Sequence, residues 1–115
     1  MMAQYKALVE SHIDYEVMCQ QFERDRLDEI VALMVETLCS KALFFTISGE
    51  EYPAELVRDR LLKINSVHIQ YVFECMSRNT RPIHNIKAYL LAVLFNASAT
   101  CGHYYDARAR HEHDD

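Results

Sequence analysis

The spacing of apolar residues along the chain predicts a largely helical protein, most clearly between residues 23 and 41. This segment, ERDRLDEIVALMVETLCSK, has apolar side chains every three or four residues, with charged side chains between them. Because an α-helix completes a turn about every 3.6 residues, this spacing places the apolar side chains on one face. The segment therefore predicts an amphipathic helix whose buried face consists of Leu27, Ile30, Val31, Met34, Val35 and Leu38.

Weaker helical patterns lie on both sides of this segment. Residues 3–20 predict one or two short helices with irregularly spaced apolar anchors. The segment EYPAELVRDRLLKI predicts a further helix, with Pro53 at its first position, where the missing N–H of proline breaks no helical hydrogen bond. The segment NSVHIQYVFECMSRNT predicts the next helix, with Asn65 or Ser66 as its N-cap.

The most apolar stretch of the chain lies within residues 81–100, RPIHNIKAYLLAVLFNASAT. Apolar and aromatic residues follow one another without a break from Ala88 to Phe95. An unbroken run of this kind covers every face of a helix and predicts burial on all sides. Pro82 disfavours helical geometry at the preceding residue, so the helix is expected to run from about Asn85, with this asparagine as its N-cap, to Ala97.

Beyond this helix the pattern weakens. Ser98 or Thr100 is expected to cap a short final helix. The charged tail, residues 107–115, is expected to fray, because terminal residues stay poorly ordered unless something ties them down.

One short segment, around Leu43–Ile47, predicts extended structure instead of helix. Its aromatic and β-branched residues favour a strand, and Gly49 ends the run. A single strand is not stable alone, because the backbone groups along its edges need partners. Three possibilities remain open: it pairs with another segment of this chain, it pairs across a dimer, or it is a packed extended loop.

Composition favours a single helical domain that spans residues 1–115. The chain has 115 residues, half of them hydrophobic, and contains only two Gly and two Pro. This length supports one core, and so few turn-forming residues argue against a β-sandwich or barrel. We therefore expect a mainly α fold: a compact bundle of about five to six helices with one short extended segment near residues 43–47.

The cysteines and the N-terminal segment favour a cytoplasmic protein. The four cysteines stand alone, without the C-x-x-C spacing of a zinc or redox site. The first residues lack the apolar stretch of a signal peptide, and no apolar run reaches the length of a membrane span.

Motifs for catalysis and for bound cofactors are missing. The two glycines, Gly49 and Gly102, stand far apart, whereas phosphate-binding loops need clustered glycines. None of the six His belongs to a recognisable nucleophile motif. The tail HEHDD carries metal-binding side chains, and Cys101 lies near His103, but neither group shows the converging ligands of a structural site. We therefore predict a protein that is not an enzyme and binds no cofactor or metal.

The charge pattern allows a local binding surface on an otherwise acidic chain. The net charge is −5, whereas a domain that binds nucleic acid alone usually has a basic excess. Basic residues beside an aromatic ring can nevertheless track a phosphate backbone and stack a base. The alternative is that these are scattered solvent-facing charges beside a half-buried tyrosine. The candidate binding residues are Arg58, Arg60, Lys63, Arg81, His84, Asn85, Lys87 and Tyr89.

Three long segments together carry a family resemblance. They read DYEVMCQQFERDRLDEIVALMVETLCSK, GEEYPAELVRDRLLKINSVHIQYVFECM and IHNIKAYLLAVLFNASAT, and they are followed by the YY pair at residues 104–105. From about Ile13 to Tyr105 the chain resembles the C-terminal domain of replication initiator protein A of plasmids and integrative elements in Firmicutes and related gut bacteria. In that family a separate N-terminal winged-helix region binds the origin. The resemblance implies the C-terminal module of a bacterial, cytoplasmic initiator.

That module is in turn similar in fold to the helical domain of DnaD-type primosomal proteins, which help recruit replicative helicase and primase. In those domains a Y-x-x-x-I-x-x-x-W pattern contributes to DNA contact. The nearest match here is Tyr89, Val93 and Ala97, and the chain contains no Trp. The resemblance therefore implies a non-catalytic adaptor that recruits a host primase, helicase or helicase loader.

The surface expected to bind this host protein contains Arg81, His84, Asn85 and Lys87. Two alternatives remain. The domain could bind single-stranded DNA directly, using the same surface together with Arg58, Arg60 and Lys63. It could also be a dimerisation module that pairs through the strand edge at Phe44–Ile47.

Overall fold

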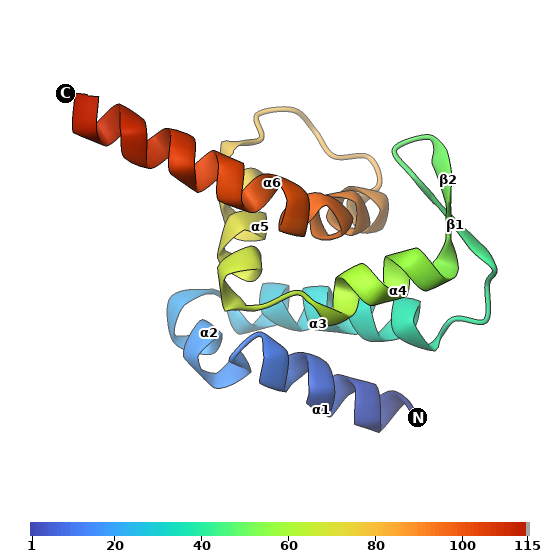
Figure 1. Cartoon of the computed structure of the whole chain (residues 1–115). Helices are drawn as coiled ribbons and strands as arrows, with labels where there is room; N and C mark the ends of the chain where they lie inside the picture. The colour runs from blue at the N-terminus through green and yellow to red at the C-terminus, as the bar shows by residue number, and fades with distance from the viewer. Residues whose placement is uncertain (115) are drawn as a thin grey trace.

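The structure, a computed structural model, describes residues 1–114, and it describes the side chains of residues 1–100 and 106–110. This part of the chain forms six α-helices and a two-stranded antiparallel sheet (Figure 1). The predicted mainly helical bundle with one short extended segment is confirmed. The elements are α1 (Met2–His12), α2 (Tyr15–Gln21), α3 (Arg24–Cys39), β1 (Phe44–Ile47), β2 (Glu50–Pro53), α4 (Ala54–Leu62), α5 (Ser66–Arg78) and α6 (Ile86–Asp114).

Helix α3 lies at the centre of the bundle. It packs along α1 and also contacts α2, α4 and α6. In Figure 1, α1 lies below α3, while α4 and α6 lie above it. This position explains why the amphipathic pattern of the segment is so clear, since neighbours cover the apolar stripe from several directions. Every residue predicted for the buried face is buried: Leu27, Ile30, Val31, Met34, Val35 and Leu38.

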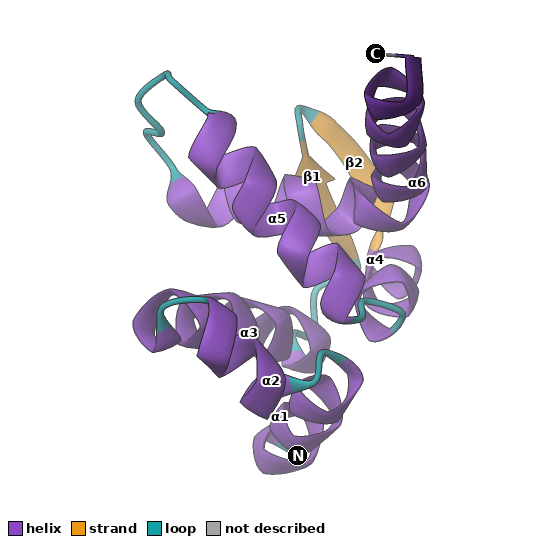
Figure 2. Cartoon of the chain, turned by 90° about the vertical axis from the view of Figure 1, so that its left-hand side faces the viewer, coloured by secondary structure: helices purple, strands orange, loops and turns teal. Residues whose placement is uncertain are grey.

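The second half of the chain builds the other side of the core. Figure 2 shows α1, α2 and α3 at the base of the molecule, with α5, α6 and the hairpin above them. Helix α6 packs mainly on α5 and also contacts α4. It buries Leu90, Leu94 and Ala97, but Ala88 is exposed. The predicted burial on all sides is therefore wrong for part of its surface, because only some of its faces meet other helices.

The extended segment is the first strand of a hairpin. Strand β1 pairs antiparallel with β2, with Thr46 opposite Glu51 and Ile47 opposite Glu50. Ser48 and Gly49 form the loop between them, with φ angles of 54° and 84°. Positive φ at both residues of a two-residue loop is the geometry of a type I′ turn, which matches the twist of paired strands. The strand therefore finds its partner within the same chain.

The hairpin corrects the predicted start of the following helix. Pro53, predicted at the first helical position, ends β2 and is the N-cap of α4. The missing N–H of proline is tolerated there, because it would point away from β1 at the edge of the sheet. The next residue, Ala54, donates its N–H to the carbonyl of Leu43 over 2.9 Å, which extends the pairing of the two strands by one residue.

Helix α6 is continuous from Ile86 to Asp114, so the predicted break at Ser98 or Thr100 is wrong. The Thr100 hydroxyl donates to the carbonyl of Asn96, one turn earlier, over 2.9 Å. A hydroxyl satisfied in this way fits inside a helix and does not cap a new one. The same hydroxyl also bonds the Tyr71 hydroxyl on α5 over 3.1 Å. Fraying of residues 107–115 stays a prediction.

The two N-terminal helices and the start of α5 agree with the sequence predictions. Residues 3–20 form two helices, separated at Asp14, which has a φ of 55°. Asn65 is the N-cap of α5, as predicted, and its side chain accepts a hydrogen bond from the N–H of His68 over 3.2 Å. No helix within residues 1–114 combines the length and the apolar character needed to cross a membrane.

Candidate functional site

The loop between α5 and α6 and the first turn of α6 form an exposed polar corner. Arg81, His84, Asn85 and Lys87 all lie on it, and all are exposed. We call these four residues the binding corner. The loop is shaped by side-chain caps: the Asn79 side chain accepts the N–H of Arg81 over 3.2 Å. The binding corner therefore has a defined backbone.

Asn85 has a structural role within the corner. It precedes the first residue of α6, and its side-chain oxygen accepts the N–H of Ala88 over 3.1 Å. This is the N-cap role expected from sequence, and it leaves the side chain directed at the helix backbone. The Arg81 guanidinium and the His84 imidazole remain available to a partner, because neither forms a hydrogen bond or ion pair with another described side chain.

Lys87 connects the corner to α3. Its ammonium group lies 3.4 Å from a carboxylate oxygen of Glu36, and both side chains are mostly exposed. An ion pair in this setting contributes little to stability, typically about 0–1 kcal/mol. Its main effect is to hold the positive charge of Lys87 beside a carboxylate, so that the corner presents charges of both signs.

A groove of about 320 Å³ opens beside this ion pair, between α3 and the start of α6. We call it the α3–α6 groove. Its apolar walls include Leu33 and Leu90, and Ile86 remains 41% exposed at its edge. Charged side chains surround these apolar groups. The lining residues are Glu29, Ala32, Leu33, Glu36, Ile86, Lys87 and Leu90.

Tyr89 faces the protein and not the corner. It is half-buried, packs against the core, and lies on the same helical face as Val93 and the fully buried Ala97. Burial and the nearby Cys75 thiol on α5 raise the pKa of its hydroxyl. The three residues that match the DnaD-type pattern therefore line the packed side of α6.

The other three basic candidates, Arg58 and Arg60 on α4 and Lys63 at its C-cap, are not part of the binding corner. The Arg58 guanidinium donates to the backbone carbonyls of Ser40 and Ala42, which ties α4 to the loop after α3. Arg60 donates to the Phe95 carbonyl over 3.4 Å, and its guanidinium carbon lies 4.2 Å from the centre of the Phe95 ring. Along α6, this point is about 15 Å from Asn85. Lys63 is exposed and forms no ion pair with any side chain that the structure describes.

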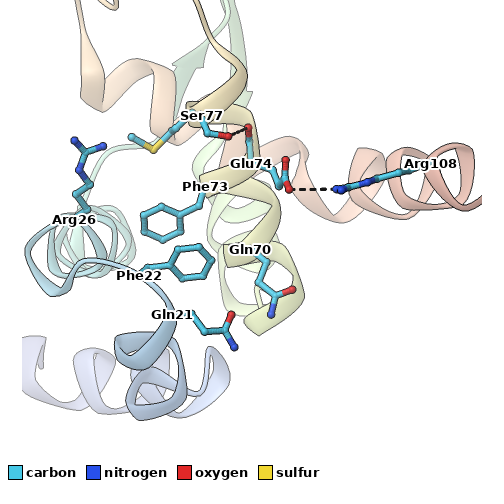
Figure 3. Close-up of a pocket in the computed structure, with 9 residues that line it drawn as sticks. Gln21, Phe22, Arg26, Gln70, Phe73, Glu74, Ser77 and Arg108 are labelled. Atoms are coloured by element: carbon cyan, nitrogen blue, oxygen red, sulfur yellow. Dashed lines mark hydrogen bonds and ion pairs between the residues drawn. The ribbon is translucent and has the colours of Figure 1, made fainter. Parts of the chain in front are cut away.

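Sequence reasoning missed a second groove, of about 570 Å³, between the end of α2, the start of α3, helix α5 and the far part of α6 (Figure 3). Phe22 and Phe73 stack on one wall, with ring centres 4.1 Å apart and planes 4° apart. On another wall of the groove, the Arg108 guanidinium lies 3.3 Å from the Glu74 carboxylate. No local pattern predicts this groove, because it requires α6 to continue past the residue at which the sequence suggested a break.

A hydrogen bond between α2 and α3 changes the acidity of the Tyr15 hydroxyl. The Tyr15 hydroxyl on α2 donates to the carboxylate of Asp28 on α3. This hydrogen bond, with a smaller contribution from the Cys19 thiol, raises the pKa of Tyr15 well above its usual range. The Tyr15 hydroxyl is therefore a structural donor that links two helices at neutral pH.

Metal ligands do not converge within the described side chains. Among these, no group of three or more His, Cys, Asp or Glu lies close enough to hold an ion. The tail HEHDD, Cys101 and His103 lie outside the side chains that the structure describes.

Comparisons with known proteins place the chain in a family but give it no described relative. No curated protein matches the sequence significantly, and no solved structure matches the fold significantly. One family matches the full range of residues 1–115. The chain therefore belongs to DUF6017, a family of unknown function.

Proposed function

We propose that this chain is a non-catalytic protein-interaction module that acts in the initiation of DNA replication on a plasmid or integrative element. Its partner is a host primase, helicase or helicase loader in the bacterial cytoplasm. The resemblance to replication initiator protein A supplies this class of partner. The observation that carries the proposal is the combination of the exposed binding corner with the adjacent α3–α6 groove.

The chemistry of this surface suits a protein better than a nucleic acid. Protein interfaces typically combine an apolar centre with a polar rim. Leu33, Ile86 and Leu90 provide the apolar part, and Lys87 and Glu36 stand at its rim. The Glu29 and Glu36 carboxylates in the same groove would repel a phosphate backbone. Arg58 and Arg60, needed for a longer basic track, have backbone partners instead.

The mechanism would be tethering. A DNA-binding region outside this chain holds the origin, and this domain binds the host protein. The host protein is thereby kept at a high local concentration at the origin, without any new contact to the DNA. Such a role requires a rigid surface, and the side-chain caps at Asn79 and Asn85 provide one.

The test is charge reversal at the corner. R81E/K87E should weaken binding to purified host primase or helicase by about tenfold or more, equivalent to ~1.4 kcal/mol, with an unchanged circular dichroism spectrum. Biolayer interferometry with each purified protein measures the effect. K63E is the matched control, because Lys63 is an exposed basic residue outside the corner, and it should bind as the wild type does.

A charge swap separates binding from local structure. K87E breaks the ion pair with Glu36, whereas E36K/K87E restores a pair with the charges exchanged. If Lys87 contacts the partner, the swap should bind as weakly as K87E. Recovered affinity in the swap, or full affinity in R81E/K87E, would remove the corner as the site.

Direct single-stranded DNA binding predicts a different result. A mobility shift with an unstructured oligonucleotide would weaken steeply with salt, because phosphate contacts release counterions. It would also be weakened by K63E as well as by R81E/K87E. The adaptor function predicts no salt-sensitive shift at concentrations where the host protein binds.

A further inference from the structure

The outer edge of β1 carries backbone groups that no described residue satisfies. The N–H of Ala54 bonds the carbonyl of Leu43, and Ile47 lies opposite Glu50 at the other end of the strand. Because hydrogen-bonded positions alternate along an antiparallel pair, the odd-numbered residues from 43 to 47 turn their backbone groups toward β2. Phe44 and Thr46 therefore direct N–H and C=O groups outward, where none of the residues whose side chains are described (1–100 and 106–110) bonds them.

The two edges of the hairpin differ in how they are protected. On β2 the outward positions are Glu51 and Pro53; proline has no N–H to offer, and Glu50 adds a second exposed carboxylate. Proline and charge are the usual devices that keep an edge from pairing. The β1 edge has neither, and its first apolar side chains are open to solvent, with Leu43 79% and Phe44 58% exposed.

The free edge is complementary to itself. When two copies of β1 run antiparallel about a two-fold axis, Phe44 lies opposite the partner's Thr46, and Phe45 lies opposite the partner's Phe45. In this register every outward N–H and C=O of both strands forms a ladder hydrogen bond, which an isologous dimer contact requires. No charged side chains face one another. The same arrangement of β2 would place Pro53 opposite the partner's Glu51, and the missing N–H of proline would leave that ladder incomplete.

We propose that two copies of this chain associate through β1 and form a four-stranded antiparallel sheet. The contact covers the exposed Phe44 side chain and uses no residue of the binding corner, so it does not depend on the proposed function. A contact of two short strands lies at the small end of specific interfaces, so the dimer is a weak one that forms at high protein concentration.

Sedimentation of the full chain across low-micromolar to near-millimolar concentrations tests the dimer. The wild type should shift from the mass of one chain to the mass of two. T46P removes an outward N–H that the hairpin itself does not use and should remain a monomer throughout. E51P makes the same change at the opposing position on the other strand and should still dimerise. Circular dichroism confirms that both variants are folded.

Paired charges test the register. F44K/T46E places opposite charges across the two-fold axis and should keep the dimer, whereas F44K/T46K places like charges there and should abolish it. A wild type that stays monomeric at every concentration would overturn the proposal, as would equal dimerisation of T46P and the wild type. Dimerisation lost in E51P but kept in T46P would assign the contact to the other edge.

Discussion

At the start of α5, the side chains of Asn65 and His68 each accept a hydrogen bond from the backbone N–H of the other residue. The Asn65 side chain accepts the N–H of His68, and the His68 imidazole Nδ1 accepts the N–H of Asn65 over 3.0 Å. The sequence predicted Asn65 or Ser66 as the N-cap, because both residue types are favoured there, and the structure shows that it is Asn65. The sequence could not assign His68, since histidine is an unusual residue for the third helical position of such a capping box, where Glu or Gln is typical.

This hydrogen bond makes the stability of α5 dependent on pH. Only neutral imidazole can accept the Asn65 N–H, and partial burial lowers the pKa of His68 from its ordinary value of 6.5. The unfolded chain therefore takes up the proton first. The stabilisation is fully present above about pH 6.5 and is lost as the pH falls from there through the lower folded-state pKa.

We expect H68Q to remove this pH dependence while keeping the cap. Glutamine can accept the same N–H but does not titrate. Urea unfolding at pH 8 and pH 5.5 should show a larger loss of stability for the wild type than for H68Q. N65A is the control for the cap itself and should be destabilised by about 1 kcal/mol at both pH values. Identical pH dependence in the wild type and H68Q would contradict this role.

Residue type alone also misled the interpretation of the arginines. Arg58 and Arg60 were candidates for an exposed basic surface, but both guanidinium groups donate to backbone carbonyls. Arg60 also lies over the Phe95 ring, where a cation and an aromatic face attract each other. Nothing in the local sequence tells a solvated arginine from one that reaches a distant carbonyl.

At the scale of elements, the hairpin shows how turn chemistry decides pairing. The sequence indicated a strand at Leu43–Ile47 but not its partner, because EEYP has weak strand character and precedes a clear helix. The useful signal was the Ser48–Gly49 pair. Small residues that tolerate positive φ between two segments predict a tight hairpin loop.

The left-handed turn predicts opposite effects for its two residues. G49A should destabilise the protein by about 1 kcal/mol, because a Cβ is strained at a φ of 84° even though open space surrounds it. S48N should stabilise it by several tenths of a kcal/mol, since asparagine adopts positive φ more readily than serine. Thermal unfolding of both variants measures the effects. A neutral G49A together with a destabilised S48N would argue against the type I′ turn.

At the scale of the whole molecule, Phe95 joins elements that are distant in the sequence. It is 1% exposed on α6, its ring lies 4.7 Å from that of Tyr52 on β2, and Arg60 of α4 covers it. Helix α6 thereby holds both the hairpin and α4 against the bundle. Because small domains are stable by only about 5–15 kcal/mol, losing the contacts of this buried ring would affect the stability of the whole fold.

We expect F95A to be among the most destabilising single changes, with a loss of about 3–5 kcal/mol, because it removes a buried ring and leaves a cavity. V67A is the control, since Val67 is a large apolar residue that is exposed on α5, and it should change stability by less than about 0.5 kcal/mol. Urea denaturation measures both. Similar losses in the two variants would mean that Phe95 does not join these elements.

The sequence by itself determined the helical class, the buried face of α3, the N-cap at Asn85, and two candidates for the N-cap of α5. These features depend on residues within a few positions of one another, where helical periodicity and capping act. Only the tertiary structure decided the partner of β1, the continuity of α6, the inward face of Tyr89 and the backbone bonds of Arg58 and Arg60. Each of these depends on contacts between segments far apart in the chain, and such contacts leave no local periodic pattern.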